Sequence, residues 1–576
     1  MPQTADETLK HYDSLLGERA PHESDWRELS DYCALARQTA LTGNAPGSKV
    51  TGKVFDSISF LAPFYLAASM GSFLTPPHTP WQRMKIRQEE LWAIDAVQDW
   101  CDDGRLRFHA ALGASTFAAD AGTAYLDLPV FGTTALFIGE RPAVRRPRVV
   151  SVPGGGFAQV GWQTFSGFRF EVAAPGSYVI AKDAQGRVDT LMRSQMMTAR
   201  QIVQEYGIEK LPDRLAKLYH DKPYETAEII HAVYPRDDAD QSRSDNRNFP
   251  WASQVIFKEG KDLLAESGFH EFPWAVPQWL VVSGQTWAIG QGHLVLPDIK
   301  TLNTAVQLRL DDWALLVRPP LFHRNGSVVG GRINWVPAGQ NAVNGNRDSV
   351  WTMQSGSRVS EAIAQEDRAE RKIREGFFTD QILALPRPSD DKIGGMSPYE
   401  VSLRQAQMLR ILGPVYGQLD PSWLQKIPER GLRLMFRGGA LAPLPPELAM
   451  RPDADIDIIS ESPMSRAQRS DEAVAIDDQL QFTAQVAEAQ LKFGREPDIL
   501  DTLDLDEASR VRAYIKGVPA KIVRGGDVVA QIRADRAQAK AQQQQQQDLL
   551  AMTEGAKNMA PMVKALQPQG GQGGGQ

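Results

Sequence analysis

The segment that decides the fold is Gly290-Gln-Gly-His-Leu-Val-Leu-Pro-Asp-Ile-Lys-Thr-Leu-Asn303, which continues without a helix breaker as far as Arg318-Pro319-Pro320. Pro297 near the first helical position and Asp298 in the first turn are signals of a helix start. Apolar residues recur at steps of three and four and form one stripe: Ile299, Leu302, Val306, Leu310, Trp313 and Val317. The pattern predicts a helix over residues 297–318, roughly 30 Å long.

Further leucines lie off that stripe, at positions 308, 315 and 316. A helix that is apolar on more than one side is typical of a buried element. We therefore expect this helix to be buried on more than one side and to pack between neighbours.

The composition is that of a globular chain. Its 576 residues, 42% of them hydrophobic and 23% charged, are enough for several domains. No run reaches the roughly 18 uninterrupted apolar residues that a membrane span needs. The longest candidate, residues 58–74, contains Pro63 and is predicted to be a buried helix. The first residues have neither a basic nor an apolar stretch, so we expect no secretory signal.

Cysteine usage and net charge narrow the class of protein. Only Cys33 and Cys101 are present, which indicates reduced core thiols in a cytoplasmic setting. The formal net charge is −7. Tight non-specific binding to DNA depends on Lys and Arg displacing counterions, so this balance argues against it.

The pattern along the chain predicts an α+β fold that is predominantly helical. Helical periodicity is found over residues 4–42, 56–74, 91–118, 198–219, 358–383, 397–437 and 462–550, the last interrupted by turns near Pro497 and Gly517-Val-Pro519. Short extended runs separated by Gly and Pro occupy residues 125–194 and 226–285, and residues 323–346 form a Gly/Asn-rich loop region. The Gln- and Gly-rich end, about the last twenty-five residues, is too polar to bury a core and is predicted to be disordered.

One motif approaches a nucleotide-binding loop. Residues 47–54, Gly-Ser-Lys-Val-Thr-Gly-Lys-Val, nearly match the phosphate-cradling pattern G-x-x-x-x-G-K-[ST]. Val54, however, has no hydroxyl to hold Mg²⁺, and residues 41–46 do not form a buried strand. We interpret the segment as an ordinary loop.

Other catalytic patterns are weaker still. Ser69 resembles a nucleophile elbow but lies within a helical run, where a small residue serves packing. Asp453, Asp455 and Asp457 could hold a hard cation, yet no calcium loop is completed and solvent-facing acids on a strand are the simpler interpretation. The nine His are scattered. We predict no enzyme, no metal site and no cofactor.

Several short segments are individually unspecific but occur in a specific order over most of the chain. They include Val54-Phe-Asp56-Ser57, Gly71 to Trp81, Phe117, Tyr125, Phe131-Gly-Thr133, Tyr178 to Gly186, Ile230 to Arg236, Glu271-Phe-Pro273, Gly290 to Asn303, Ser397 to Val401, Arg404, Leu412-Gly-Pro414, Pro463 to Gln468, Gly517-Val-Pro519 and Gln531-Ile-Arg533. Together they resemble the head-to-tail connector, or portal, proteins of short-tailed, T7-like podovirus bacteriophages. One departure is Gln278-Trp279, where the family leads us to expect Arg-Trp.

The resemblance implies a ring, usually of about twelve subunits, at one vertex of the phage capsid. Double-stranded DNA would be packaged and ejected through its channel. The implied partners are a terminase packaging motor, the major capsid and scaffolding proteins, a tail adaptor and internal core or ejection proteins, with no membrane. The protein would be part of the virion and be assembled in the host cytoplasm.

The family's parts can be assigned by position. The resemblance assigns residues 1–195 and 351–459 to the wing, 196–222 to a first stem helix, 223–290 to the clip with a return segment, 291–320 to a second stem helix, 321–350 to the channel loop region, 460–550 to the crown and 551–576 to a disordered tail.

Candidate site residues follow from this assignment. The channel loop would present His323, Arg324, Asn325 and Arg332, the channel-lining helix Asp298, Lys300, Arg309 and Asp312, and the clip interface Trp251, Phe257, Phe269 and Trp274. A conduit must let DNA slide, and an acidic wall avoids the phosphate contacts that would hold it. Solvated charges are the simpler interpretation of the loop arginines, and the clip aromatics could equally be core residues.

Two other classes of function stay open. One is a metal-dependent nuclease or packaging ATPase built on residues 47–54 and the aspartates around Asp455. The other is a tail or capsid component without a channel. ATP hydrolysis that is lost on Lys53→Ala would identify the former, and the mass of the native assembly would separate the latter from a ring.

Overall fold

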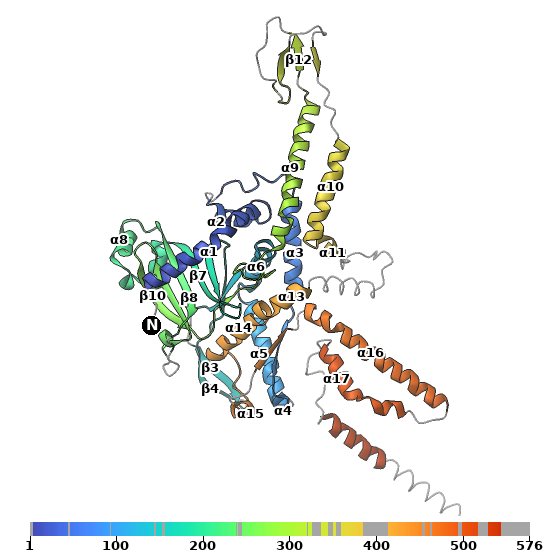
Figure 1. The fold of residues 1–576 in the computed structure, drawn as a ribbon. Coiled ribbons are helices and arrows are strands. Elements are labelled where there is room, and N and C mark those ends of the chain that lie inside the picture. Colours follow the sequence, from blue (N-terminus) through green and yellow to red (C-terminus); the bar gives the residue numbers. More distant parts are fainter. Residues whose placement is uncertain are drawn as a thin grey trace, which may run out of the picture. The chain divides into compact units, whose positions relative to one another are not determined.

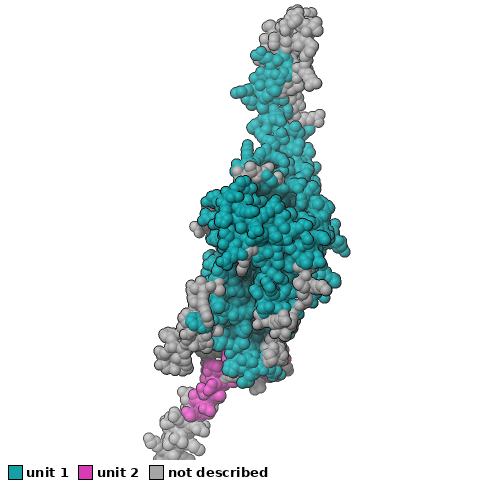
Figure 2. All heavy atoms as spheres, turned by 90° about the vertical axis from the view of Figure 1, so that its left-hand side faces the viewer, with its two compact units in different colours: residues 1–92, 99–471 teal, residues 93–98, 472–576 magenta. Residues whose placement is uncertain are grey.

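The computed structural model describes residues 4–43, 47–92, 94–142, 146–152, 156–237, 239, 245–319, 321–324, 334, 336–343, 350–352, 359–383, 413–451, 456–460, 463–493, 498–515 and 528–542. The chain divides into two compact units (Figure 2). One consists of residues 1–92 and 99–471, and the other of residues 93–98 and 472–576.

A five-stranded antiparallel sheet lies in the first unit (Figure 1), in the order β10-β9-β8-β7-β6. Its strands are β6 (Tyr178–Lys182), β7 (Val188–Thr198), β8 (Thr226–Pro235), β9 (Trp251–Phe257) and β10 (Asp262–Phe269). Successive residues of a strand point to opposite faces. Ile230 accordingly joins one core cluster and Ile229 the other, so the sheet is covered on both faces.

Helix α1 (Ala5–Tyr32) covers one of these faces. Its Leu9, Tyr12 and Leu15 pack against Val179, Met192, Ile230 and Ile256. Thr4 and Glu7 form a capping box at the start of this helix, which satisfies two backbone N–H groups that the helix itself leaves unbonded.

The opposite face is covered by α7 (Ala199–Tyr206) and α8 (Asp213–Asp221). Ile202 and Leu215 pack there on Ile229 and Phe257. The expected single helix over residues 198–219, or 196–222 as a stem helix, is therefore wrong. Gly207 ends α7 with a φ of 80°, which favours glycine. Leu211, the residue before Pro212, is extended, so the chain turns a second time before α8.

A second, three-stranded sheet has the order β11-β2-β5. It contains β2 (Ala135–Glu140), β5 (Phe168–Ala173) and β11 (Trp274–Ala275). Helix α6 (Phe117–Phe131) leads into it and ends at Gly132, whose φ of 83° is typical of a helix C-terminus. Residues 125–131, expected to belong to the extended part, are thus helical.

Two further pairs of strands are antiparallel. β3 (Arg146–Val152) pairs with β4 (Gly156–Gln163). β1 (Gln82–Ile86) pairs with β15 (Ile456–Ser460), which joins segments far apart in the sequence. An ion pair between Arg87 and Asp457 continues this ladder, with N–O distances of 2.6 and 3.1 Å.

Helix α9 (Gln291–Val317) and helix α10 (Val359–Gly376) run antiparallel beside each other (Figure 1). Between them in the sequence lies a small sheet of β12 (Leu321–Arg324), β13 (Gln340–Val343) and β14 (Val350–Thr352). It lies at the end of the helix pair. The loop expected at residues 323–346 therefore contains strand residues at both ends.

Among the described residues, the first unit also contains the α-helices α2 (Gln38–Thr42), α3 (Ile58–Leu74), α4 (Glu89–Trp92), α5 (Asp95–Gly113), α11 (Thr379–Leu383), α13 (Gly413–Leu419), α14 (Lys426–Arg437) and α15 (Pro446–Ala449). The first residues of α5 belong to the second unit. The second unit contains most of α16 (Pro463–Lys492) and all of α17 (Leu505–Ile515). Within it, Arg512 pairs with Asp477 and Arg533 with Asp506. Among the described residues, no helix is long and apolar enough to cross a membrane.

Candidate assembly site on helices α9 and α10

The start of α9 is set by glycines. The helix begins at Gln291, six residues before the expected start, so Pro297 lies inside it. A Cβ on Gly290 would lie 2.6 Å from the carbonyl oxygens of Pro129 and Val130, and one on Gly292 would lie 2.7 Å from the latter. The glycine motif therefore lets α9 pack directly against the end of α6. This long-range contact, rather than Pro297, decides where the helix starts.

The first half of α9 is buried on one side. Val295, Leu296, Ile299, Leu302 and Val306 all have exposed fractions below 10%. Ile299, Leu302 and Val306 belong to the predicted apolar stripe, and their burial confirms this part of it.

Asn303 fixes a loop to the same helix. Its side-chain oxygen accepts a hydrogen bond from the Phe55 N–H at 2.7 Å, and its amide donates to the Lys53 carbonyl at 2.7 Å. The Lys53 ammonium pairs with Asp31 at 2.6 Å. Residues 47–54 contain neither helix nor strand, which confirms their interpretation as a loop, and the helix expected from residue 56 begins only at Ile58. The lysine of the near-match motif is thus held by a carboxylate of α1.

The outer half of α9 is exposed. Leu308 is 63% exposed, Trp313 53% and Val317 78%, and Leu310 and Leu316 are exposed as well. The expectation that the helix is buried on more than one side is therefore wrong for this half in the single chain. The helix extends beyond the body of the unit, where α10 runs beside it.

Charged residues hold α10 against α9. Arg309 pairs with the mostly buried Glu366 at 2.8 Å, and Lys372 pairs with Asp298 at 3.2 Å. Of the predicted channel-lining residues, Asp298 and Arg309 thus bridge the two helices, while Lys300 pairs with Glu28 of α1 at 3.0 Å. Three of these four charges are neutralised within the chain.

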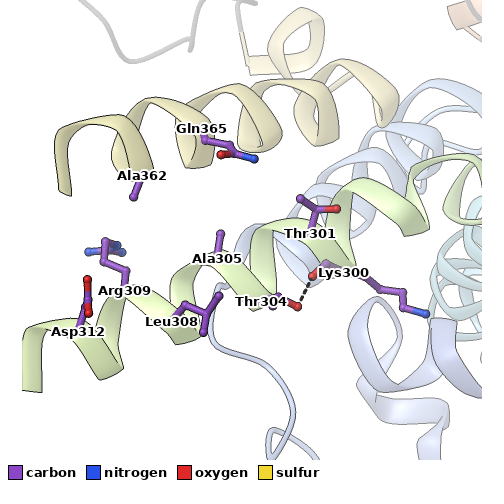
Figure 3. Close-up of a pocket in the computed structure, with 9 residues that line it drawn as sticks. All are labelled: Lys300, Thr301, Thr304, Ala305, Leu308, Arg309, Asp312, Ala362 and Gln365. Atoms are coloured by element: carbon purple, nitrogen blue, oxygen red, sulfur yellow. Dashed lines mark hydrogen bonds between the residues drawn. The ribbon is translucent and has the colours of Figure 1, made fainter. Parts of the chain in front are cut away.

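A groove of about 750 Å³ runs between the two helices (Figure 3). Its lining combines small, polar and apolar side chains: Lys300, Thr301, Thr304, Ala305, Leu308, Arg309 and Asp312 of α9, with Ala362 and Gln365 of α10. Asp312, the fourth predicted channel residue, is one of them. The groove is open to solvent, and the exposed Leu308 lies along it.

Two of the four predicted loop residues follow α9 in the described part of the chain. His323 and Arg324 belong to β12, where they pair with Ala342 and Val343 of β13. Their side chains are not described, and Asn325 and Arg332 lie outside the described residues. Their contact with DNA stays a prediction.

The predicted clip aromatics divide into two groups. Phe257 and Trp274 are each only 2% exposed and pack within the first unit, so they are core residues and not interface anchors. Trp251 and Phe269 are partly exposed. Trp251 lies against Phe272 with ring centroids 5.1 Å apart. Their role at an interface stays a prediction.

One arginine of α14 is buried, which its sequence neighbourhood does not indicate. Arg430 of α14 is 2% exposed, donates to the Ile138 carbonyl at 2.8 Å and pairs with Glu271 at 3.1 Å. Burial lowers the pKa of Arg430 to about 10. Burial alone would raise the pKa of Glu271. The hydrogen bond and the positive charge of Arg437 outweigh this effect, so the pKa of Glu271 is lowered. This cluster joins α14 to β2, and no local pattern around residue 430 indicates it.

The remaining candidate catalytic groups have structural partners. Ser69 lies within α3, as predicted. Asp457 pairs with Arg87, while Asp453 and Asp455 lie outside the described residues. The His231 ring is hydrogen-bonded to Ser253 at 2.9 Å, and its burial together with the charge of Arg193 lowers its pKa to about 4. Among the described residues, no three His, Cys, Asp or Glu are grouped as metal ligands.

Comparison with known proteins identifies the family. Residues 5–523 match the model of the bacteriophage head to tail connecting protein. The chain is 27% identical over 566 residues to the probable portal protein of Bordetella phage BPP-1 and 25% identical over 562 residues to the portal protein of Salmonella phage epsilon15. Each alignment covers 96% of this chain and 94% of the relative. The chain belongs to the family of bacteriophage head-to-tail connecting proteins.

Proposed function

We propose that this chain is the subunit of a phage portal, a ring of about twelve copies at the capsid vertex through which double-stranded DNA is packaged and ejected. The observation that carries the proposal is the family match over residues 5–523, together with near full-length similarity to two proteins named as portals. The protein acts through its geometry and not by catalysis.

The helix pair supports a revised assignment of the family's parts. We propose that α9 and α10 form the stem and that the sheet of β12, β13 and β14 forms the clip, because a clip follows one stem helix and precedes the other. Residues 223–290 then belong to the wing, since β8, β9 and β10 share one sheet with β6 and β7. Residues 460–550 remain the proposed crown.

The proposed partners are those of a portal. The clip would bind the terminase motor during packaging and the tail adaptor afterwards, and the wing would contact the major capsid and scaffolding proteins. The crown faces internal core or ejection proteins. Assembly would take place in the host cytoplasm, and the finished ring would be a virion component.

The test is the mass and projection image of the purified assembly. A closed ring of about a dozen chains with an axial opening is the expected result. Monomers or open filaments, under conditions in which the protein is functional, would contradict the proposal. Arg324 now belongs to the proposed clip. Packaging by an Arg324→Glu variant tests the prediction that this residue contacts DNA, and normal packaging would remove that prediction.

The alternative of an ATPase on residues 47–54 is not favoured. The Lys53 ammonium pairs with Asp31 of α1 at 2.6 Å. The Lys53 backbone carbonyl accepts a hydrogen bond from Asn303 of α9, so the loop is held by two helices. ATP hydrolysis by the purified chain that disappears on Lys53→Ala would reverse this conclusion.

A further inference from the structure

A closed ring needs two different, complementary surfaces on each copy, because its interfaces are head to tail. This inference rests on the proposed ring and asks which surfaces meet. Two features beside α9 are candidates: the loop of residues 47–57, called here the pinned loop, and the groove between α9 and α10.

The two features lie on opposite sides of one helix. Asn303, which holds the pinned loop, and Asp312, which lines the groove, are nine residues apart. Nine residues make about two and a half turns of helix, so the two side chains point in opposite directions. The groove lining runs from Lys300 to Asp312 and therefore spans the level of Asn303.

The pinned loop offers apolar and basic side chains. Phe55 is 42% exposed and Val50 36%, although both are large apolar residues. Lys49 is exposed and makes no ion pair among the described residues. The two hydrogen bonds between Asn303 and the loop backbone hold the loop in place before any partner binds, which reduces the entropy lost on docking.

The groove between α9 and α10 offers apolar and acidic side chains that complement those of the pinned loop. Leu308 and Ala305 supply an apolar floor, and Leu308 is 63% exposed. Asp312 has no ion pair within the described part of the chain, whereas Arg309 beside it is already bound to Glu366. The charge left for a partner is therefore acidic and matches Lys49.

We propose that the pinned loop of one copy docks into the α9–α10 groove of the next copy around the ring. Phe55 or Val50 covers Leu308, and Lys49 pairs with Asp312. The exposed apolar half of α9 then becomes part of the contact between copies.

Cysteine crosslinking tests the geometry. Thr51 and Gln365 are both exposed, one on the loop and one at the groove. The native Cys33 and Cys101 are buried, and burial raises the pKa of each thiol to about 12, so the unmodified chain is a suitable background. Oxidised rings of the Thr51→Cys/Gln365→Cys variant should give a ladder of covalent multimers beyond the dimer. Each single variant should give no such ladder.

Charge reversal tests the pairing. Lys49→Glu or Asp312→Lys alone should raise the concentration needed for ring formation about threefold to tenfold, and the double variant should restore it. A matched control is Lys10→Glu, an exposed change on α1 away from the groove lining.

The outcomes separate the two proposals. Intact rings without a crosslink ladder, or charge reversals without mutual rescue, would overturn the docking inference and leave the portal proposal standing. If the unmodified chain forms no closed ring under any condition in which it is functional, the portal proposal itself fails.

Discussion

The five-stranded sheet and the outer half of α9 are both rich in large apolar residues, but only the sheet is complete in one chain. Ile230 is fully buried between α1 and its own strand neighbours, whereas Trp313 is 53% exposed. Burying apolar area gives roughly 25 cal/mol per Å². The sheet gains that free energy when the chain folds, and the outer α9 can gain it only from another copy.

The largest expected effect on the single chain comes from the sheet. Ile230→Ala should lower the free energy of unfolding by about 2–5 kcal/mol, because it leaves a cavity in a fully packed core. Urea denaturation of dilute, monomeric protein measures this. Leu308→Ala removes a side chain of similar size and is the matched control. A loss of the same size in that control would erase the distinction between the two regions.

Acidification should weaken the sheet through His231. Its pKa is about 4 in the folded chain, against 6.5 for an ordinary histidine. Between those pH values the unfolded chain binds a proton that the folded chain does not, so stability falls as pH drops from 6.5 towards 4. The loss is at most about 3 kcal/mol.

The measurement is the denaturation midpoint at several pH values. His231→Gln removes the titrating group and should flatten the dependence below pH 6.5, even if the variant is less stable at neutral pH. An unchanged slope in that variant would show that other groups carry the dependence.

The next largest effect on the free energy of unfolding should come from the contact between α9 and α6. Gly292→Ala places a Cβ 2.7 Å from the Val130 carbonyl oxygen and should cost about 1–3 kcal/mol. Gly122→Ala in α6 is the control, since nothing lies within 4 Å of its Cβ and alanine favours a helix. Thermal unfolding should move in opposite directions for the two variants. Equal shifts would contradict the close packing of α6 and α9.

The smallest expected effect on the isolated chain comes from Trp313. Trp313→Ser should change the unfolding free energy of the monomer by less than about 0.5 kcal/mol, since the residue is largely exposed. The same change should reduce ring formation, because the proposed contact loses an apolar anchor. Analytical ultracentrifugation measures the second effect. Rings as stable as those of the unmodified chain would place this face outside the contact.

Local patterns predicted much of the fold. The strands near residues 134–138 and 168–172 and the helix at 58–74 follow from periodicity and turn residues, and the structure confirms them. The start of α9 could not be predicted, because it depends on the approach of Gly290 and Gly292 to α6, more than 150 residues earlier in the chain. Only contacts distant in sequence reveal why those glycines are needed.

The candidate site was predicted less well. The apolar stripe of α9 was visible in the sequence, but periodicity cannot tell whether the same chain or another copy covers it. For Phe257 and Trp274 the sequence left an interface and a core equally open, and their burial places both in the core of the chain. Arg430 was missed because its partners Ile138 and Glu271 come from distant segments.

The pairing of β1 with β15 has a mechanical consequence. A pull transmitted along the backbone from α16 reaches residues 456–460 before any earlier strand or helix, and these residues pair with residues 82–86. A pull along the strand direction loads the hydrogen bonds of this pair together, and the Arg87–Asp457 ion pair adds to the resistance. The β1–β15 pair would therefore bear a force applied to the C-terminal helices before that force reaches α9 and α10.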